Sequence, residues 1–131
     1  MGVVESLGLV DEVIFTSFVA EADLPAYYSR AEVFVLPTLY EGLDFPVLEA
    51  MACTYPVITF NNSSLPEVVG EAGIMLNAYD INRLVQAMRQ VLTDSKLRDN
   101  IIKKGLEQAK SFSWEKAVEQ TLEGYNKVEN R

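Results

Sequence analysis

The sequence predicts an α/β protein with a Rossmann-like parallel sheet followed by C-terminal helices. Short β-type runs alternate with helical stretches over about residues 12–79, and the links between them are short. This alternation predicts right-handed crossovers between parallel strands. From about residue 80 to 128, apolar side chains recur at three- and four-residue steps, which is typical of helices. At 131 residues, we expect one domain or part of one.

Four segments of the first part are expected as strands. Residues 13–18 are rich in β-branched and aromatic side chains, which favour strands. Residues 33–36 are wholly apolar and precede Pro37, which suits a strand covered on both faces of a parallel sheet. Residues 57–60 and 73–76 are the third and fourth expected strands.

Capping residues and prolines bound the expected helices between these strands. Asp23 has the side chain of a helix N-cap, and Pro25 is tolerated in the first turn that follows. A longer helix is expected to begin at about Pro46 and to end before Pro56, because proline cannot continue a helix. Residues 66–69 are expected to form a short helical turn.

Three further helices are expected in the terminal part of the chain. Asp80 caps the first, whose apolar positions run over residues 81–92. The second covers about residues 97–109. Ser113 caps the third, which carries apolar side chains on one side over residues 114–125.

Composition and charge argue against several classes of partner. The net charge is -8 and no Lys/Arg cluster stands out, so neither a nucleic acid nor an anionic lipid surface is an expected partner. No apolar run reaches the roughly 20 residues of a membrane span. The N-terminus has no signal-peptide pattern. We therefore expect a cytoplasmic protein.

The residue types that usually hold metals are scarce. The chain has no histidine, and Cys53 is its single cysteine, so a zinc site cannot be built in the usual way. An internal disulfide is equally excluded. We interpret Cys53 as a small buried apolar side chain.

The segment with the most chemical information is residues 37–58. Glu41 follows the apolar strand, Gly42 sits in the turn, and Glu49 lies in the first turns of the next helix. Open α/β sheets bind ligands at this carboxyl edge, where a helix N-terminus attracts anions. The pattern indicates a phosphate cradle with two hydroxyl-binding acids. The alternative is that Glu49 is only a solvated charge near a helix N-terminus.

The same segment resembles the donor-binding signature of retaining glycosyltransferase family four, which has the GT-B fold. The family pattern is E-G-F-G-L-P-x-L-E-A-M-A-C-G-x-P-V-I, and residues 41–58 read E-G-L-D-F-P-V-L-E-A-M-A-C-T-Y-P-V-I. Further segments resemble the family at residues 15–19, 24–37, 63–73 and 112–115. The resemblance covers nearly the whole chain.

The resemblance implies a hexosyltransferase that moves a sugar from a nucleotide-diphosphate donor to an acceptor with retention of configuration. Glu41 is then the catalytic-site acid near the hydroxyls of the transferred sugar. Glu49 would accept hydrogen bonds from the donor ribose. Most of the family works without a bound metal, so neither a metal nor a cofactor is expected beside the nucleotide sugar.

The remaining donor-binding positions also follow from the resemblance. Amide groups beside Gly42 would cradle the sugar and diphosphate, and two residues at the end of the first expected strand would line the base pocket. The cradle residues are Leu43, Asp44 and Phe45, and the base-pocket residues are Phe18 and Val19.

Three positions depart from glycines that are usual in the family. Asp44 either caps the helix or repels the diphosphate, and we expect the cap with reduced donor affinity. Thr54 follows the helix where glycine takes a left-handed conformation, which costs a β-branched residue on the order of 1 kcal/mol or forces another exit. Ser17 is a milder change.

The resemblance also implies that residues 1–131 are a partial C-terminal lobe. Family members carry an N-terminal acceptor-binding lobe, and their C-terminal lobe begins with two strands and a basic pair that have no counterpart here. We therefore expect the isolated chain to be inactive. A non-catalytic, truncated nucleotide-binding or assembly module is the alternative. A glycosidase carboxylate pair is a weaker one.

The missing strands would leave a gap between residues 13–18 and 33–36. Three arrangements are open: direct pairing of these segments, pairing with a second copy of the chain, or detachment of residues 13–18. Exposed strand edges are templates for pairing, so we expect self-association as a homodimer.

Overall fold

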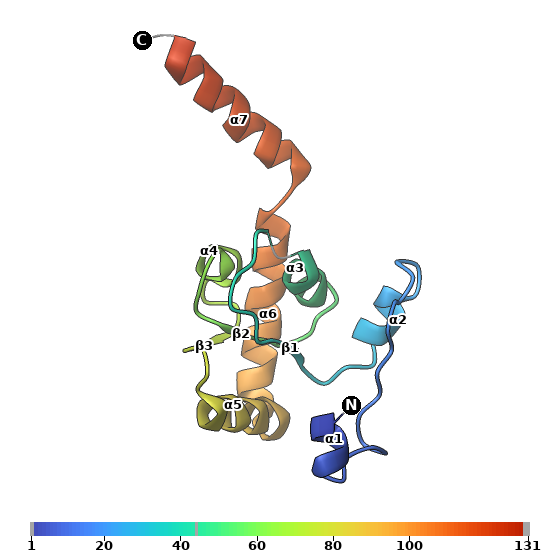
Figure 1. Ribbon diagram of the computed structural model, residues 1–131. Coiled ribbons are helices and arrows are strands. Elements are labelled where there is room, and N and C mark those ends of the chain that lie inside the picture. Colours follow the sequence, from blue (N-terminus) through green and yellow to red (C-terminus); the bar gives the residue numbers. More distant parts are fainter. Residues whose placement is uncertain (1, 44, 130–131) are drawn as a thin grey trace.

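The computed structural model describes residues 2–43 and 45–129 (Figure 1). Helices and strands alternate through the first part of the chain, and three helices end it. In chain order they are α1 (Gly2–Ser6), α2 (Leu24–Tyr28), β1 (Phe34–Leu36), α3 (Phe45–Ala52), β2 (Val57–Phe60), α4 (Leu65–Val69), β3 (Ile74–Leu76), α5 (Ile81–Thr93), α6 (Ser95–Ser111) and α7 (Trp114–Glu129).

The three strands form one parallel sheet in the order β1-β2-β3. Phe34 is in register with Val57, and Ile58 with Ile74. Since β2 is the central strand and is fully buried, both of its faces must be covered by helices. The expected α/β class with a parallel sheet is confirmed.

Helices cover both faces of the sheet and divide the core in two. On one side α3 and α4 pack against Val57, with Met51 and Leu65 fully buried. On the other side α5 packs against Ile58 through Val91. Helix α6 runs along α3 and α5 and contributes to both clusters (Figure 1).

Helices α3 and α6 approach each other closely. Gly105 of α6 faces Met51 of α3, and a Cβ atom added at Gly105 would lie 3.3 Å from the Met51 side chain. A residue with a Cβ atom at position 105 would therefore require the Met51 side chain to move. This contact holds α3, and with it Glu49, against the body of the protein.

The expected strand at residues 13–18 is wrong. These residues are irregular, Ile14 and Phe18 are 84% and 90% exposed, and residues 14–18 form no hydrogen bond within the described chain. They belong to an N-terminal arm, residues 2–32, that lies beside the sheet rather than in it (Figure 1). The physical reason is that a strand needs a paired neighbour, and β1 pairs with β2 alone. Of the three arrangements considered, the structure has the detached one.

Of the four expected helix caps, two are confirmed, one is wrong, and Asp44 lies outside the described residues. The Asp80 carboxylate accepts a hydrogen bond from the Arg83 amide at 3.0 Å, and the Ser113 hydroxyl accepts one from Lys116 at 3.2 Å. Asp23 makes no side-chain cap bond, although α2 begins directly after it. Its backbone is helical, with φ -95° and ψ -17°, whereas a capping side chain reaches the helix from extended backbone.

Thr54 has the left-handed backbone that its place after α3 requires, with φ +68°. Ser17 in the arm is also left-handed, with φ +54°. Glycine is usual at both positions in the family, whereas this chain has residues with a Cβ atom there. The chain therefore keeps the family's backbone path at Thr54 at an energetic cost.

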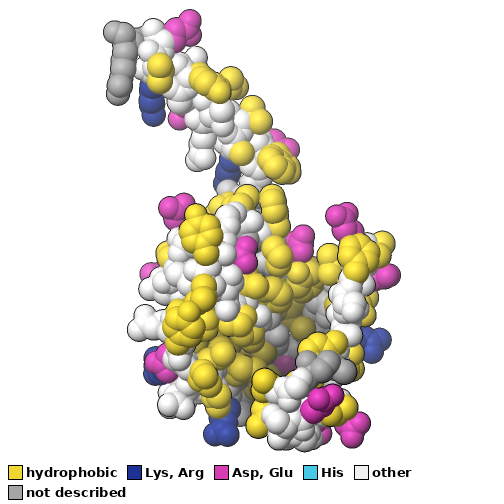
Figure 2. Space-filling model, in the orientation of Figure 1, with side chains coloured by type: hydrophobic (Ala, Val, Ile, Leu, Met, Phe, Trp, Pro, Cys, Tyr) yellow, Lys and Arg dark blue, Asp and Glu magenta, His cyan; other side chains and the backbone are white. Residues whose placement is uncertain are grey.

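Helix α7 projects away from the body of the protein (Figure 1). None of its described residues is buried, and its apolar side chains are exposed, Trp114 at 76%. Figure 2 shows hydrophobic side chains gathered along α7 and in the hollow between the core and the N-terminal arm. Within residues 2–43 and 45–129, no helix has both the length and the apolar composition needed to cross a bilayer.

Candidate functional site

The site is built on the loops that follow β1 and β2. Because these strands are parallel neighbours, their carboxyl ends lie at the same edge of the sheet. The Asn62 side-chain amide donates to the Thr38 carbonyl at 3.1 Å. The Ser63 hydroxyl donates to the Glu41 carbonyl and accepts from the Glu41 amide at 3.3 Å. The β2–α4 loop thus holds the β1–α3 loop from two sides.

These hydrogen bonds between the two loops fix the Glu41–Gly42 turn. The Ser64 hydroxyl donates to the Gly42 carbonyl, directly after the Ser63 contact with Glu41. The Glu41 carboxylate is itself oriented, because the Thr38 hydroxyl donates to its Oε1 at 2.9 Å. Glu41 is half-buried, so its side chain has a defined direction in the loop.

Glu49 lies on the exposed side of α3 and meets the N-terminal arm. The Tyr28 hydroxyl of α2 donates to Glu49 Oε2 at 3.2 Å. The pKa of Tyr28 is raised to about 12, first by burial, then by the negative charge of Glu49 and its hydrogen bond, and least by Cys53. Tyr28 is therefore a neutral donor to the carboxylate at neutral pH.

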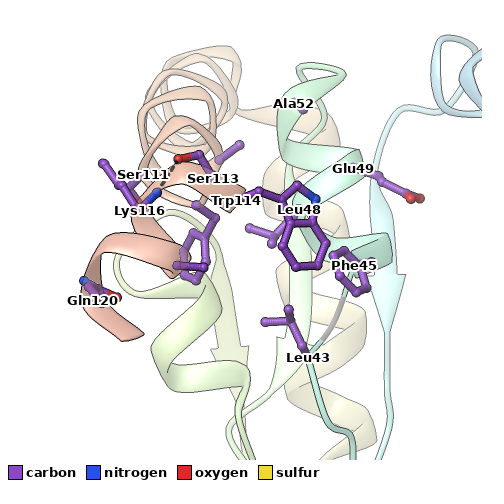
Figure 3. A pocket seen from close by; sticks show the side chains of 13 residues that line it. Leu43, Phe45, Leu48, Glu49, Ala52, Ser111, Ser113, Trp114, Lys116 and Gln120 are labelled. Carbon is purple, nitrogen blue, oxygen red and sulfur yellow. Dashed lines mark hydrogen bonds between the residues drawn. The ribbon is translucent and has the colours of Figure 1, made fainter. Parts of the chain in front are cut away.

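A cleft of about 520 Å³ opens between α3 and the junction of α6 and α7. Figure 3 shows Leu43, Phe45 and Leu48 directed toward Trp114 across this cleft. The rings of Phe45 and Trp114 lie 6.5 Å apart between centroids. Glu49 lines the cleft from α3, with its carboxylate turned away from the Trp114 side (Figure 3).

The structure brings some of the expected site residues together and leaves others apart. Leu43, Phe45 and Glu49 line the cleft, and Glu41 and Gly42 lie in the cross-linked loop next to it. The base-pocket candidates do not line this cleft, and Asp44 lies outside the described residues. Those two candidates, Phe18 and Val19, are in the N-terminal arm.

Sequence reasoning missed three groups that form the site. Asn62 and Ser63 were not among the expected site residues, although their side chains hold the Glu41 loop. Trp114 was expected only as an apolar residue of the last helix, although it forms one wall of the cleft. The position of Asn62 and Ser63 at the carboxyl end of a parallel strand is the signal that could have identified them.

The arrangement can hold an anionic ligand that carries hydroxyl groups. The first amides of a helix have no intrahelical carbonyl partner, and α3 begins at Phe45, soon after the Glu41–Gly42 turn. The Phe45 amide itself donates to the Leu43 carbonyl at 3.0 Å. Carboxylates accept hydrogen bonds from hydroxyl groups; Glu41 precedes α3, and Glu49 lies within it. Among the residues that the structure describes, no three His, Cys, Asp or Glu side chains are grouped to hold a metal ion.

Fold and site together define an α/β domain that presents a ligand site at the carboxyl edge of a parallel sheet. Residues 3–108 match the family described as "Glycosyl transferases group 1". The chain belongs to this glycosyltransferase family.

Relatives with curated names include mannosyltransferases. The chain is 42% identical over 111 residues to O-antigen chain mannosyltransferase B of Escherichia coli. This match covers 85% of the chain and 29% of the relative. The chain thus spans less than a third of that relative's length.

Solved structures of the same fold are also similar. Sucrose-phosphate synthase from Thermosynechococcus elongatus matches with a TM-score of 0.84 and 32% identity, over 97% of the chain and 33% of the synthase. The C-terminal domain of LpcC, a glycosyl transferase group 1 family protein of Francisella tularensis, matches with a TM-score of 0.74 and 27% identity. That match covers 84% of the chain and 58% of the LpcC domain. These neighbours are GT-B glycosyltransferase domains, in agreement with the expected fold.

Proposed function

We propose that the chain is the donor-binding part of a retaining hexosyltransferase of family four. It binds a nucleotide-diphosphate sugar at the edge of the sheet, and the hexose passes to an acceptor held elsewhere. The observation that carries this proposal is the turn at Glu41 and Gly42, which Ser63 and Ser64 of the β2–α4 loop hold just before α3. The mannosyltransferase relatives favour mannose as the hexose.

Each part of the donor is assigned to a part of the site. The diphosphate lies at the N-terminus of α3, where backbone amides point outward. The Glu41 carboxylate accepts hydrogen bonds from hydroxyl groups of the transferred sugar. The Glu49 carboxylate accepts hydrogen bonds from the ribose hydroxyls. No metal or cofactor is required in this proposal, since helix amides supply the positive partner of the phosphates.

Calorimetry with uridine, guanosine and adenosine diphosphates tests the proposal. A diphosphate should bind more tightly than its nucleoside, because the helix N-terminus acts through the phosphates. Glu49→Ala should weaken diphosphate binding by roughly 1.5–3 kcal/mol, the range of a hydrogen bond to a charged group. Glu67→Ala is a matched control on α4, since its exposed carboxylate lies outside the cleft. Equal binding by wild type and Glu49→Ala would remove the donor-site assignment.

The isolated chain is expected to form no glycoside with an added acceptor. Transfer requires both reactants to be held in line, and this chain supplies only the donor side of the proposed enzyme. The measurement is product formation from a nucleotide sugar and an acceptor, with free sugar released by hydrolysis as the control. Glycoside formed by the purified chain would contradict the requirement for a separate acceptor lobe. A cytoplasmic location belongs to the same proposal.

A non-catalytic binding or assembly module is the second candidate. Exposed apolar side chains on the arm and on α7 favour it, because such surfaces serve contacts with other proteins. The substitution Glu41→Gln, made in the assembled enzyme, distinguishes the two candidate functions. An enzyme loses transfer, whereas a binding module keeps its association unchanged.

A further inference from the structure

Tyr28 is the residue through which the N-terminal arm meets the site. Its hydroxyl donates to Glu49 Oε2 at 3.2 Å. Its ring packs on Phe34 of β1, with ring centroids 5.8 Å apart and a tilt of 51° between the planes. Both ends of the Tyr28 side chain are therefore held, one by the edge of the sheet and one by the carboxylate.

This contact leaves the Glu49 carboxylate with one oxygen engaged and one available. Within the described chain, Oε1 of Glu49 takes part in no hydrogen bond or ion pair. Glu49 is exposed on α3, and an exposed glutamate on its own samples several rotamers. The Tyr28 hydrogen bond selects among these rotamers and sets the direction of the other oxygen.

We infer that Tyr28 is a positioning residue of the donor site, whose hydroxyl orients the Glu49 carboxylate toward a ribose hydroxyl. The inference rests on the proposed function, because it requires Glu49 to bind the ribose. A pre-oriented acceptor binds more tightly, since less rotamer freedom is lost when the ligand arrives. Tyr28 does not touch the donor in this assignment.

The ionisation of Tyr28 is consistent with this role. Its pKa of about 12 keeps the hydroxyl protonated, so it donates to the carboxylate under all ordinary conditions. The neighbouring Tyr27 is exposed, and within the described chain its hydroxyl forms no hydrogen bond. Tyr27→Phe is therefore a matched control for Tyr28→Phe, with the same chemical change one residue away.

The experiment measures discrimination between ribose and deoxyribose by the full chain. Calorimetry first identifies the tightest of uridine, guanosine and adenosine diphosphates, and then compares it with its 2′-deoxy counterpart. Tyr28→Phe should weaken the ribonucleotide about three- to tenfold, the range of one hydrogen bond. The deoxynucleotide should change little, so discrimination should fall. Tyr27→Phe should leave both dissociation constants unchanged.

Glu49→Gln separates this inference from the proposed function. Glu49→Gln should abolish discrimination, and adding Tyr28→Phe to it should cause no further loss, because Tyr28 acts through Glu49. If Glu49→Gln loses discrimination while Tyr28→Phe keeps it, the proposed function stands and the inference is wrong. Equal weakening of both nucleotides by Tyr28→Phe would mean a structural role and would also overturn it. Absence of binding by the wild type would overturn both.

A second measurement does not depend on nucleotide binding. Alkaline ultraviolet titration of the wild type should contain a tyrosine transition near pH 12 that is missing in Tyr28→Phe. In Glu49→Gln this transition should move to lower pH, because the negative charge and its hydrogen bond are removed. Burial remains and keeps the transition above the ordinary tyrosine range. A transition unmoved by Glu49→Gln would rule out the contact on which the inference depends.

Discussion

The sheet core differs from the two appendages, the N-terminal arm and α7, in how far apolar side chains are buried. In the core, β2 is covered on both faces, and side chains such as Leu65 and Val91 are fully buried. The N-terminal arm and α7 have comparable apolar side chains, yet α1, α2 and α7 contain no buried residue. The same kinds of side chain are thus inside in one region and outside in the other.

This difference indicates which part of the chain buries its apolar side chains without a partner. Residues from β1 to α6 bury an apolar core among themselves, and their three strands pair with one another. The arm and α7 leave large apolar side chains exposed, and such surfaces are typical of contacts with other proteins. We therefore expect core substitutions to act on folding and appendage substitutions to act on association.

Two Leu→Ala substitutions, one in each region, should give the largest difference in unfolding free energy. Leu65→Ala removes a side chain that is 0% exposed and should cost about 2–5 kcal/mol of unfolding free energy. Leu122→Ala on α7, where the leucine is 56% exposed, should change it by less than about 0.5 kcal/mol. Urea unfolding measures both. Similar losses for the two variants would mean that α7 packs on the core in solution.

Self-association should depend on the arm rather than on the core. Ile14→Asn removes an exposed β-branched side chain from residues 13–18, and should weaken a homodimer about tenfold or more, from the apolar area lost. Ile81→Asn, at an exposed position at the start of α5, is the control and should have no effect. Sedimentation across a concentration series gives the dissociation constants.

Salt should strengthen this association. Arg30 is the single basic residue of the N-terminal arm, residues 2–32, which carries six Asp and Glu residues. Two such arms repel each other, and added salt screens the repulsion. A chain that stays monomeric at every concentration and salt level would exclude the homodimer and leave the family membership untouched.

Glycine substitutions at the two left-handed positions should give the smallest difference. Thr54→Gly relieves the φ of +68° after α3 and should raise the free energy of unfolding by about 1 kcal/mol. Ser17→Gly relieves a similar φ of +54° in the arm, but should leave global unfolding unchanged because the arm is not part of the cooperative core. Thermal unfolding compares the two. A matching gain at Ser17 would show that the arm unfolds with the core.

The same division separates what sequence reasoning found from what it missed. Three of four strands, the caps at Asp80 and Ser113, and the backbone of Thr54 follow from residues close in sequence. The strand expected at residues 13–18 has the right composition but no neighbour to pair with. Asp23 has a capping side chain but the wrong backbone conformation.

The residues of the candidate site divide in the same way. The sequence by itself determined that Glu41 and Glu49 lie after a parallel strand and on the next helix, because hydrophobic periodicity and spacing are local properties. Only the tertiary structure decided what each acid contacts. Thr38 and Ser63 hold the Glu41 turn, and Tyr28 reaches Glu49 across 21 positions of the chain. Such contacts depend on which loops and helices the parallel sheet places side by side, and that arrangement arises from packing of the whole core.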